Sequence, residues 1–227
     1  MDSLELAKWA NKLQVSPVEI IREEKEVFIL DRLSQSPIGD KIVFKGGTAL
    51  RLIYGSPRFS QDLDFSLRKS ISIKDLKKVL IEISHQHTDI TIKDLYDKRY
   101  TIFSLLTVKP LAFKQSFSIK IEISKRDKKL KREDWSLMAV RSPISILTPL
   151  VYSCSLKRIL FEKKIALKTR SEPRDYFDLW WIGQKLNLKL KIPKPKIVKS
   201  KFKGEINQLL PNYLKNWSED FLKQYEK

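Results

Sequence analysis

The spacing of apolar side chains divides the chain into a front part rich in strands and a back part rich in helices. Alternating or continuous apolar runs predict strands at residues 41–44, 62–67, 90–95, 100–108 and 117–124. Apolar residues at helical spacing predict helices at residues 17–33, 48–54, 73–84, 155–169, 174–186, 204–210 and 212–225. A small mixed sheet with helices, followed by a helical region, corresponds to the α+β class.

A charged connection, residues 124–134, separates the two parts. We therefore expect three regions: an N-terminal helical segment at 1–40, an α/β core at 41–125 and a helical C-terminal domain at 126–227. A chain of 227 residues is long enough to bury a sizeable core as one domain or two small ones.

The first candidate for chemistry is the glycine pair Gly46-Gly47, which lies between a predicted strand and a predicted helix. Backbone N–H groups at a helix start can hold an anion, and missing side chains let a phosphate approach closely. Thr48 adds a hydroxyl and is an acceptable N-cap. The alternative is a plain tight turn.

The second candidate is a set of carboxylates on strands. Asp62 and Asp64 are two residues apart, so they share one strand face about 7 Å from each other. Carboxylates of this kind suit Mg²⁺, although an exposed strand face also often carries Asp at alternate positions. Glu122, with Lys120 on the same face of a later strand, is a candidate third metal ligand or general base. An ordinary solvent-facing Glu is the alternative.

The charge favours polyanionic partners. The chain carries 45 Lys and Arg against 27 Asp and Glu, a formal net charge of +18. Eight lysines and no acid lie in residues 185–203, although a generally lysine-rich proteome would also explain the excess. The single cysteine, the acidic start without a signal-peptide pattern, and the short uncharged runs predict a cytoplasmic protein without a membrane span.

The stretch "FKGGTALRLIYGSPRFSQDLDF", residues 44–65, resembles the signature of the AbiEii/AbiGii-type toxin nucleotidyltransferases, within the polymerase-β-like superfamily. The resemblance implies a polymerase-β-like core in which Gly46, Gly47, Asp62, Asp64 and Glu122 form the site. Matches to the R-x-S-x-D-x-D run add two residues, Arg58 and Ser60. The resemblance leaves open whether Arg58 contacts phosphate or only braces the loop.

A second stretch, "FEKKIALKTRSEPRDYFDLWW" at residues 161–181, is similar to a later motif of that family. Lys163 and Arg170 share a helix face, where they could meet a triphosphate. Asp175 either orients Lys163 or touches the nucleotide, and Asp178 is a candidate nucleotide contact. Alternatively, these acids pair with nearby cations and lock two helices together. The resemblance covers roughly residues 20–185.

The resemblance implies a metal-dependent nucleotidyltransferase that uses Mg²⁺ or Mn²⁺ and takes an NTP as substrate. Asp62, Asp64 and Glu122 are the expected metal ligands, and Lys163 and Asp175 join them as catalytic residues. It also implies a toxin with a cognate antitoxin; for some members of the family the acceptor is the 3′ end of tRNA, and the net charge of +18 suits such an RNA acceptor. Two alternatives remain: transfer to a protein or small molecule, and a nucleic-acid-binding module without catalysis.

Overall fold

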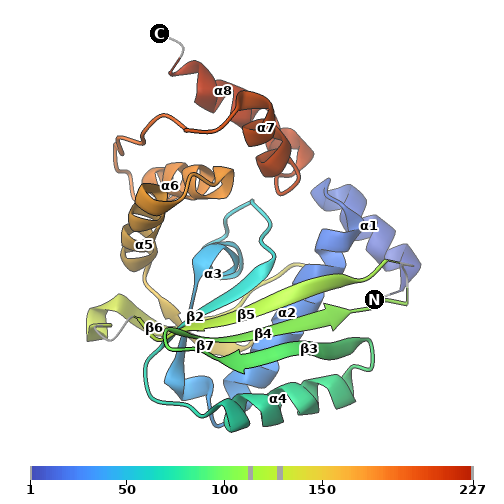
Figure 1. Ribbon diagram of the computed structural model, residues 1–227. Helices are drawn as coiled ribbons and strands as arrows, with labels where there is room; N and C mark the ends of the chain where they lie inside the picture. Colours follow the sequence, from blue (N-terminus) through green and yellow to red (C-terminus); the bar gives the residue numbers. More distant parts are fainter. Residues whose placement is uncertain (1, 112–114, 127–129, 226–227) are drawn as a thin grey trace.

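The structure is a computed structural model that describes residues 2–111, 115–126 and 130–225 (Figure 1). Seven strands of these residues form one mixed sheet in the order β3-β4-β5-β2-β1-β7-β6. The strands are β1 (Ile42–Lys45), β2 (Asp62–Leu67), β3 (Ile90–Asp97), β4 (Thr101–Val108), β5 (Phe117–Ser124), β6 (Trp135–Ala139) and β7 (Leu150–Cys154).

Helices within the described ranges flank this sheet and follow it. They are α1 (Ser3–Leu13), α2 (Pro17–Gln35), α3 (Gly46–Leu52), α4 (Ile73–Gln86), α5 (Leu156–Thr169), α6 (Pro173–Lys185), α7 (Lys199–Asn207) and α8 (Trp217–Lys223). Short 3₁₀ turns lie at η1 (Gly39–Lys41), η2 (Arg132–Asp134) and η3 (Asn212–Leu214). The α+β class predicted from the sequence is confirmed.

The centre of the sheet combines parallel and antiparallel pairing around β2. β2 runs antiparallel to β1 and parallel to β5, and β1 also pairs in parallel with β7. The register places Asp64 opposite Lys45 on one side and opposite Glu122 on the other. Because side chains alternate along a strand, Leu63 and Phe65 enter the core while the aspartates face the other way.

One face of the sheet is covered by α2 and α4, whose apolar residues join the main core. α4 begins with a capping box between Ser72 and Asp75, which satisfies two backbone N–H groups at its start. The opposite face, near β2 and β5, lies below α5 and α6 in Figure 1. This arrangement leaves one side of the central strands facing the helical region.

The C-terminal helices have an aromatic core of their own. Tyr176 and Phe177 of α6 pack with Phe202 of α7 and with Trp217 and Phe221 of α8. The tryptophan Trp217 is 8% exposed and contacts several of these rings. α6 therefore joins two cores, since its Leu179 and Ile182 belong to the main one.

The strand predictions for 62–67 and 117–124 are confirmed to the residue. The expectation that the chain turns helical after residue 125 is wrong for β6 and β7, which complete one edge of the sheet. A sequence pattern did not predict these strands because each is only five residues long and two prolines, Pro143 and Pro149, interrupt the segment between them. The division at residues 40 and 125 stays a prediction, and residues 127–129 of the charged connection lie outside the described residues.

Three helices also differ from the sequence patterns. α1 lies in the predicted N-terminal helical segment, but no helix was predicted at its own residues. α7 spans residues 199–207 where a helix was predicted at 204–210, and the helix predicted at 212–225 is divided into η3 and α8. In the described part of the chain, none of the helices combines the length and apolar character needed to cross a membrane.

Candidate active site

Three carboxylates meet at the centre of the sheet because β2 and β5 run side by side. The register pairs Asp62 with Lys120 and Asp64 with Glu122. All four side chains therefore share the face that looks towards α5 and α6, and all four line one cleft. The sequence-predicted D-x-D pair and the more distant Glu122 are brought together.

The ammonium group of Lys120 lies among these carboxylates. Its Nζ is 3.3 Å from Asp62 Oδ2 and 3.6 Å from Glu122 Oε2. Burial lowers the pKa of Lys120, but the charges of Asp62, Asp64 and Glu122 outweigh it and raise that pKa above its ordinary value. A positive charge is therefore already stabilised between the carboxylates.

For the carboxyl group of Asp64, the surroundings disfavour the charged form. Burial, and then the neighbouring charge of Asp62, raise its pKa above the ordinary value, although Lys120 and Lys163 lower it in part. The ionised form of Asp64 is therefore disfavoured in the folded protein without an added cation.

The glycine pair is needed for close packing of the site's own side chains. Gly46 has a positive φ of 81°, and a Cβ there would lie 2.6 Å from Asp64 Oδ2. A Cβ on Gly47 would overlap the Arg58 guanidinium and lie 2.7 Å from Ser60 Oγ. Any larger residue at these positions would therefore push Asp64 or Arg58 out of place.

Thr48 differs from its predicted role at the helix start. α3 begins at Gly46 with Lys45 as its N-cap residue, so the N-cap prediction for Thr48 is wrong. The Thr48 side chain is buried, and its hydroxyl donates a hydrogen bond to the backbone carbonyl of Asp62. Thr48 therefore holds the start of β2 against α3 and does not line the cleft.

A buried ionic network fastens the helical region to the sheet. Arg58 donates two hydrogen bonds to Asp178, at 2.8 Å from Nε to Oδ1 and 2.9 Å from Nη2 to Oδ2. The Lys163 ammonium contacts Asp175 Oδ1 and Asp178 Oδ2, each at 2.7 Å. Arg170 Nε adds a bond of 2.8 Å to Asp175 Oδ2. The network thus links the loop before β2 to α5 and α6.

Both aspartates of the network are fully buried. Burial alone would raise their pKa values, but Lys163 lowers the pKa of Asp175, and Arg58 followed by Lys163 lowers that of Asp178. Neither aspartate lines the cleft, whereas Arg58, Lys163 and Arg170 do. These contacts are the ones expected if Asp175 orients Lys163 and Arg58 braces its loop, and equally the ones expected if the acids lock the two helices together.

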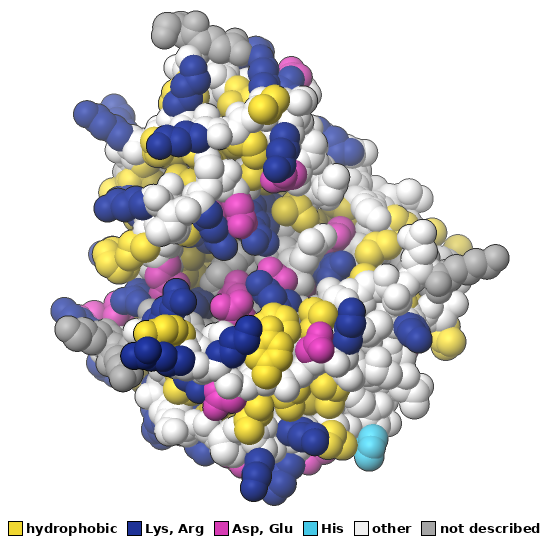
Figure 2. Space-filling model, in the orientation of Figure 1, with side chains coloured by type: hydrophobic (Ala, Val, Ile, Leu, Met, Phe, Trp, Pro, Cys, Tyr) yellow, Lys and Arg dark blue, Asp and Glu magenta, His cyan; other side chains and the backbone are white. Residues whose placement is uncertain are grey.

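The cleft itself has a volume of about 460 Å³ and lies between the sheet and α5. Figure 2 shows a hollow there, rimmed by acidic and basic side chains. Sequence patterns had not singled out Lys45, Arg126 or Arg158 among its lining residues. Lys45 could be inferred from sequence, because it directly precedes Gly46 at the end of a strand. Arg126 and Arg158 come from distant parts of the chain, so only the fold brings them to the cleft. There, Arg158 Nε bonds Glu162 at 2.9 Å, and Lys45 Nζ lies 3.3 Å from the same carboxylate.

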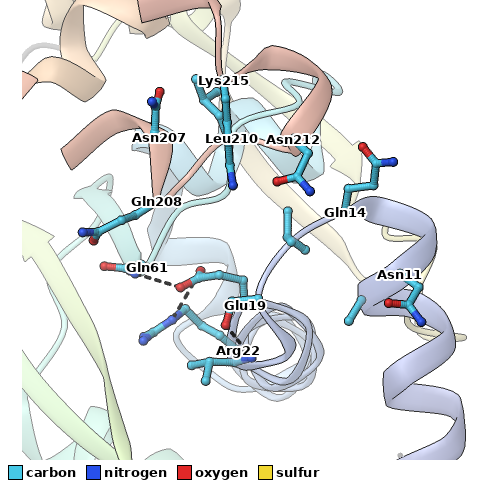
Figure 3. A pocket seen from close by; sticks show the side chains of 14 residues that line it. Asn11, Gln14, Glu19, Arg22, Gln61, Asn207, Gln208, Leu210, Asn212 and Lys215 are labelled. Atoms are coloured by element: carbon cyan, nitrogen blue, oxygen red, sulfur yellow. Dashed lines mark hydrogen bonds and ion pairs between the residues drawn. The ribbon is translucent and has the colours of Figure 1, made fainter. Parts of the chain in front are cut away.

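A second cavity, of about 840 Å³, lies on the other side of the segment before β2 (Figure 3). Gln61 projects into it, and its amide donates a hydrogen bond of 2.9 Å to Glu19 of α2. Burial is the main cause that raises the pKa of Glu19. Since Ser60 and Asp62 line the first cleft instead, the chain from 60 to 62 separates the two cavities.

The carboxylate face fits a divalent cation by the chemistry of its donors. Carboxylate oxygens are the ligands that Mg²⁺ and Mn²⁺ prefer, and Lys120 shows that the site attracts positive charge. Among the residues that the structure describes, however, no three His, Cys, Asp or Glu side chains converge closely enough to form a complete metal cage. A metal here would therefore complete its coordination with water or with substrate oxygens.

Comparison with known proteins identifies the class of this protein as a nucleotidyltransferase. Residues 29–214 match the family described as nucleotidyl transferase AbiEii toxin of type IV toxin–antitoxin systems, and the chain belongs to that family. No curated protein matches the chain in sequence.

Solved structures support the same fold. MenT4, a nucleotidyltransferase toxin from Mycobacterium tuberculosis, superposes with a TM-score of 0.61 at 18% identity, covering 91% of this chain and 69% of that one. A putative nucleotidyltransferase from Helicobacter pylori gives 0.58 at 20% identity, covering 94% and 100%. JHP933 from the same organism gives 0.57 at 22% identity, covering 92% and 79%.

The buried network generates a prediction about stability. Changing Asp178→Asn should lower the free energy of unfolding by roughly 3–5 kcal/mol, because Arg58 and Lys163 lose a buried counter-charge. Urea unfolding followed by circular dichroism measures this. Asp40→Asn, in the exposed pair with Lys69, is the matched control and should leave the midpoint unchanged. Equal stability of Asp178→Asn and wild type would refute the role of the network.

The raised pKa of Asp64 predicts a pH-dependent effect of its removal. Below the ordinary pKa of 3.8, Asp64 is protonated in both folded and unfolded chains, so Asp64→Asn should match wild type in stability. As pH rises through the folded pKa, wild type must hold a disfavoured charge, so the variant should become the more stable protein. Unfolding at several pH values without divalent metal tests this. A variant that loses stability relative to wild type as pH rises would contradict it.

Proposed function

We propose that this family member transfers a nucleotide from an NTP to the 3′ end of tRNA in a metal-dependent reaction. The observation that carries the proposal is the pairing of Asp62 and Asp64 on β2 with Glu122 on β5, all facing one cleft beside Gly46-Gly47. This places a carboxylate face and a tight backbone turn within one cavity of nucleotide size.

In this proposal Asp62, Asp64 and Glu122 hold Mg²⁺ or Mn²⁺. The metal would neutralise charge on the triphosphate and on the leaving pyrophosphate. Asp62 and Asp64 are held on a rigid strand by Leu63 and Phe65. The Glu122 side chain is 41% exposed, so it is also placed to accept the proton of the attacking hydroxyl.

The triphosphate is assigned to the part of the cleft between Gly46-Gly47, which adjoins Asp64, and the cations of α5 and of the residue that follows it. Gly46 and Gly47 offer backbone groups, and Ser60 lies beside Gly47 and lines the cleft. Arg170 is 45% exposed at its side chain, so it can reach a phosphate while bonded to Asp175. Lys163 and Arg58 line the cleft and supply positive charge to the triphosphate. Asp175 and Asp178 fix the orientation of these two side chains. Thr48 contributes by holding β2.

The RNA acceptor is inferred from charge. The chain has a formal net charge of +18, and phosphate contacts supply affinity that does not depend on sequence. Five lysines between α6 and α7, or at the end of α6, are exposed: Lys185, Lys189, Lys191, Lys194 and Lys196. They lie at the end of α6 and along the segment that joins α6 to α7. We place the protein in the cytoplasm, with the cognate antitoxin of its toxin–antitoxin system as partner.

A labelling experiment tests the proposal. Purified protein is incubated with each α-³²P NTP, Mg²⁺ and either total RNA or purified tRNA, and the products are separated by electrophoresis. We expect label at the tRNA 3′ end with wild type, and none with Asp64→Asn. The Tyr213→Ala variant, at an exposed residue outside the cleft, should label as wild type does. Label only in protein or in small molecules would overturn the tRNA assignment.

The position of Lys120 generates a prediction about metal binding. Lys120→Met removes the cation between Asp62 and Glu122, so Mn²⁺ should bind the nucleotide-free protein on the order of tenfold more tightly. Isothermal titration calorimetry measures this without any activity assay. Lys125→Met, whose ammonium pairs with Asp97 outside the cleft, is the control and should leave affinity unchanged. Weaker binding by Lys120→Met would show that the carboxylates do not form the metal site.

A further inference from the structure

Two large apolar side chains stand exposed inside the otherwise charged cleft. Phe161 is 55% exposed and Ile165 is 46% exposed, and both line the same cavity as Gly46 and Asp64. They are four residues apart on α5, so they lie next to each other along one edge of the helix. Together they form an apolar strip, Phe161 and Ile165, on the helix side of the cleft.

The rest of α5 shows why this strip faces the cleft. Lys163, between the two residues in sequence, is buried against α6 through Asp175 and Asp178. Leu156, Ile159 and Leu160 enter the core. These contacts fix the rotation of the helix, so Phe161 cannot be buried by turning α5 without breaking the ionic network.

The exposure of Phe161 is exceptional within this protein. Among the described residues, it is the sole phenylalanine that is more than half exposed, whereas Phe44, Phe59, Phe65, Phe177, Phe202 and Phe221 are buried. The two exposed tyrosines, Tyr100 and Tyr213, lie outside this cleft. Single exposed apolar residues are usual on an open surface and need no explanation. Phe161 differs because its ring is exposed inside a cleft lined mainly by charged side chains.

The surroundings of the strip restrict what it can bind. A ligand that contacts Phe161 needs an apolar, planar face. It also needs negative charge, which the cations of the cleft and a metal ion on its carboxylates would bind. The guanidinium of Arg158 lies 5.6 Å from the Phe161 ring centroid, and Ser124 and Arg126 supply polar groups within the same cavity. A nucleobase attached to a triphosphate has these properties, because its face stacks on aromatic rings and its edge accepts and donates hydrogen bonds.

We propose that Phe161 is the stacking platform for the base of the incoming NTP, with Ile165 extending the apolar surface beneath it. This inference rests on the proposed function and adds where the base lies. It also assigns an orientation: the triphosphate lies towards Gly46-Gly47 and the carboxylates, and the base lies against α5. Because every base has a stacking face, Phe161 supplies affinity without choosing among the four bases.

Direct binding measurements test the platform. Kd values for the NTP that wild type uses, and for inorganic triphosphate, are measured by calorimetry with Mn²⁺ for wild type, Phe161→Ala, Phe161→Leu and Phe161→Trp. We expect Phe161→Ala and Phe161→Leu to weaken NTP binding roughly 5- to 100-fold, with Phe161→Trp close to wild type. Inorganic triphosphate, which lacks a base, should bind all four proteins equally.

The matched control is Tyr213→Ala, which removes an exposed aromatic ring outside the cleft and should leave both Kd values unchanged. Circular dichroism confirms that each variant is folded; the exposure of Phe161 predicts little loss of stability. In steady-state transfer, Phe161→Ala should raise KM for the NTP by a similar factor and leave KM for the RNA unchanged.

The outcomes separate this inference from the function on which it rests. Wild type that binds no NTP would overturn both. If wild type binds the NTP and Phe161→Ala binds it equally well, the platform alone is overturned. The same holds if Phe161→Leu and Phe161→Trp have equal Kd values for the NTP. Equal weakening of inorganic triphosphate, or a rise in KM for the RNA only, would also overturn it, because Phe161 would then act elsewhere than on the NTP base.

Discussion

The cleft depends on one buried set of charges. Arg58 and Lys163 share Asp178, and Lys163 also holds Asp175. A buried ion pair stabilises a fold only when each member keeps its partners, since one unpaired charge in the interior is strongly unfavourable. These contacts consequently fix three elements at once: the loop before β2, α5 and α6. The distance from the carboxylates to the helical wall follows from that constraint.

Electrostatic repulsion also acts within the carboxylate face, where the strands hold like charges close together. Asp62, Asp64 and Glu122 are like charges on adjacent strands, and Lys120 compensates them in part. The register of β2 and β5 leaves them no room to separate, because both strands are anchored by apolar residues on the other face. The absence of side chains at Gly46 and Gly47 tightens the arrangement further. Such a site favours a bound cation over the free state, which suits metal-assisted chemistry.

Much of this could be predicted from sequence, and the failures have physical causes. Alternation located β2 and β5, and the shared face of Lys120 and Glu122 was evident from spacing alone. The family resemblance added Arg58 and Asp178, but their partnership joins residues 120 positions apart, which no local pattern reports. β7 was missed because its five residues are too short a run to give a clear period, and its partners β1 and β6 become neighbours only in the fold. Gly46-Gly47 is predicted to be a phosphate turn; the structure adds a second requirement for glycine, because a Cβ at either position would collide with Asp64, Arg58 or Ser60.

The order of the strands has a consequence for how the protein is made. The two aspartates of β2 leave the ribosome early, whereas β1 gains its second neighbour only with β7, and Arg58 gains its carboxylate only with α6. A nascent chain that has not yet reached α6 carries an incomplete sheet and an unpaired arginine, and domains generally fold as units. For a toxin, this topology delays the assembled cleft until most of the polypeptide exists. Chains that end before α6 would therefore lack the buried contacts that hold the helical wall of the cleft against the sheet.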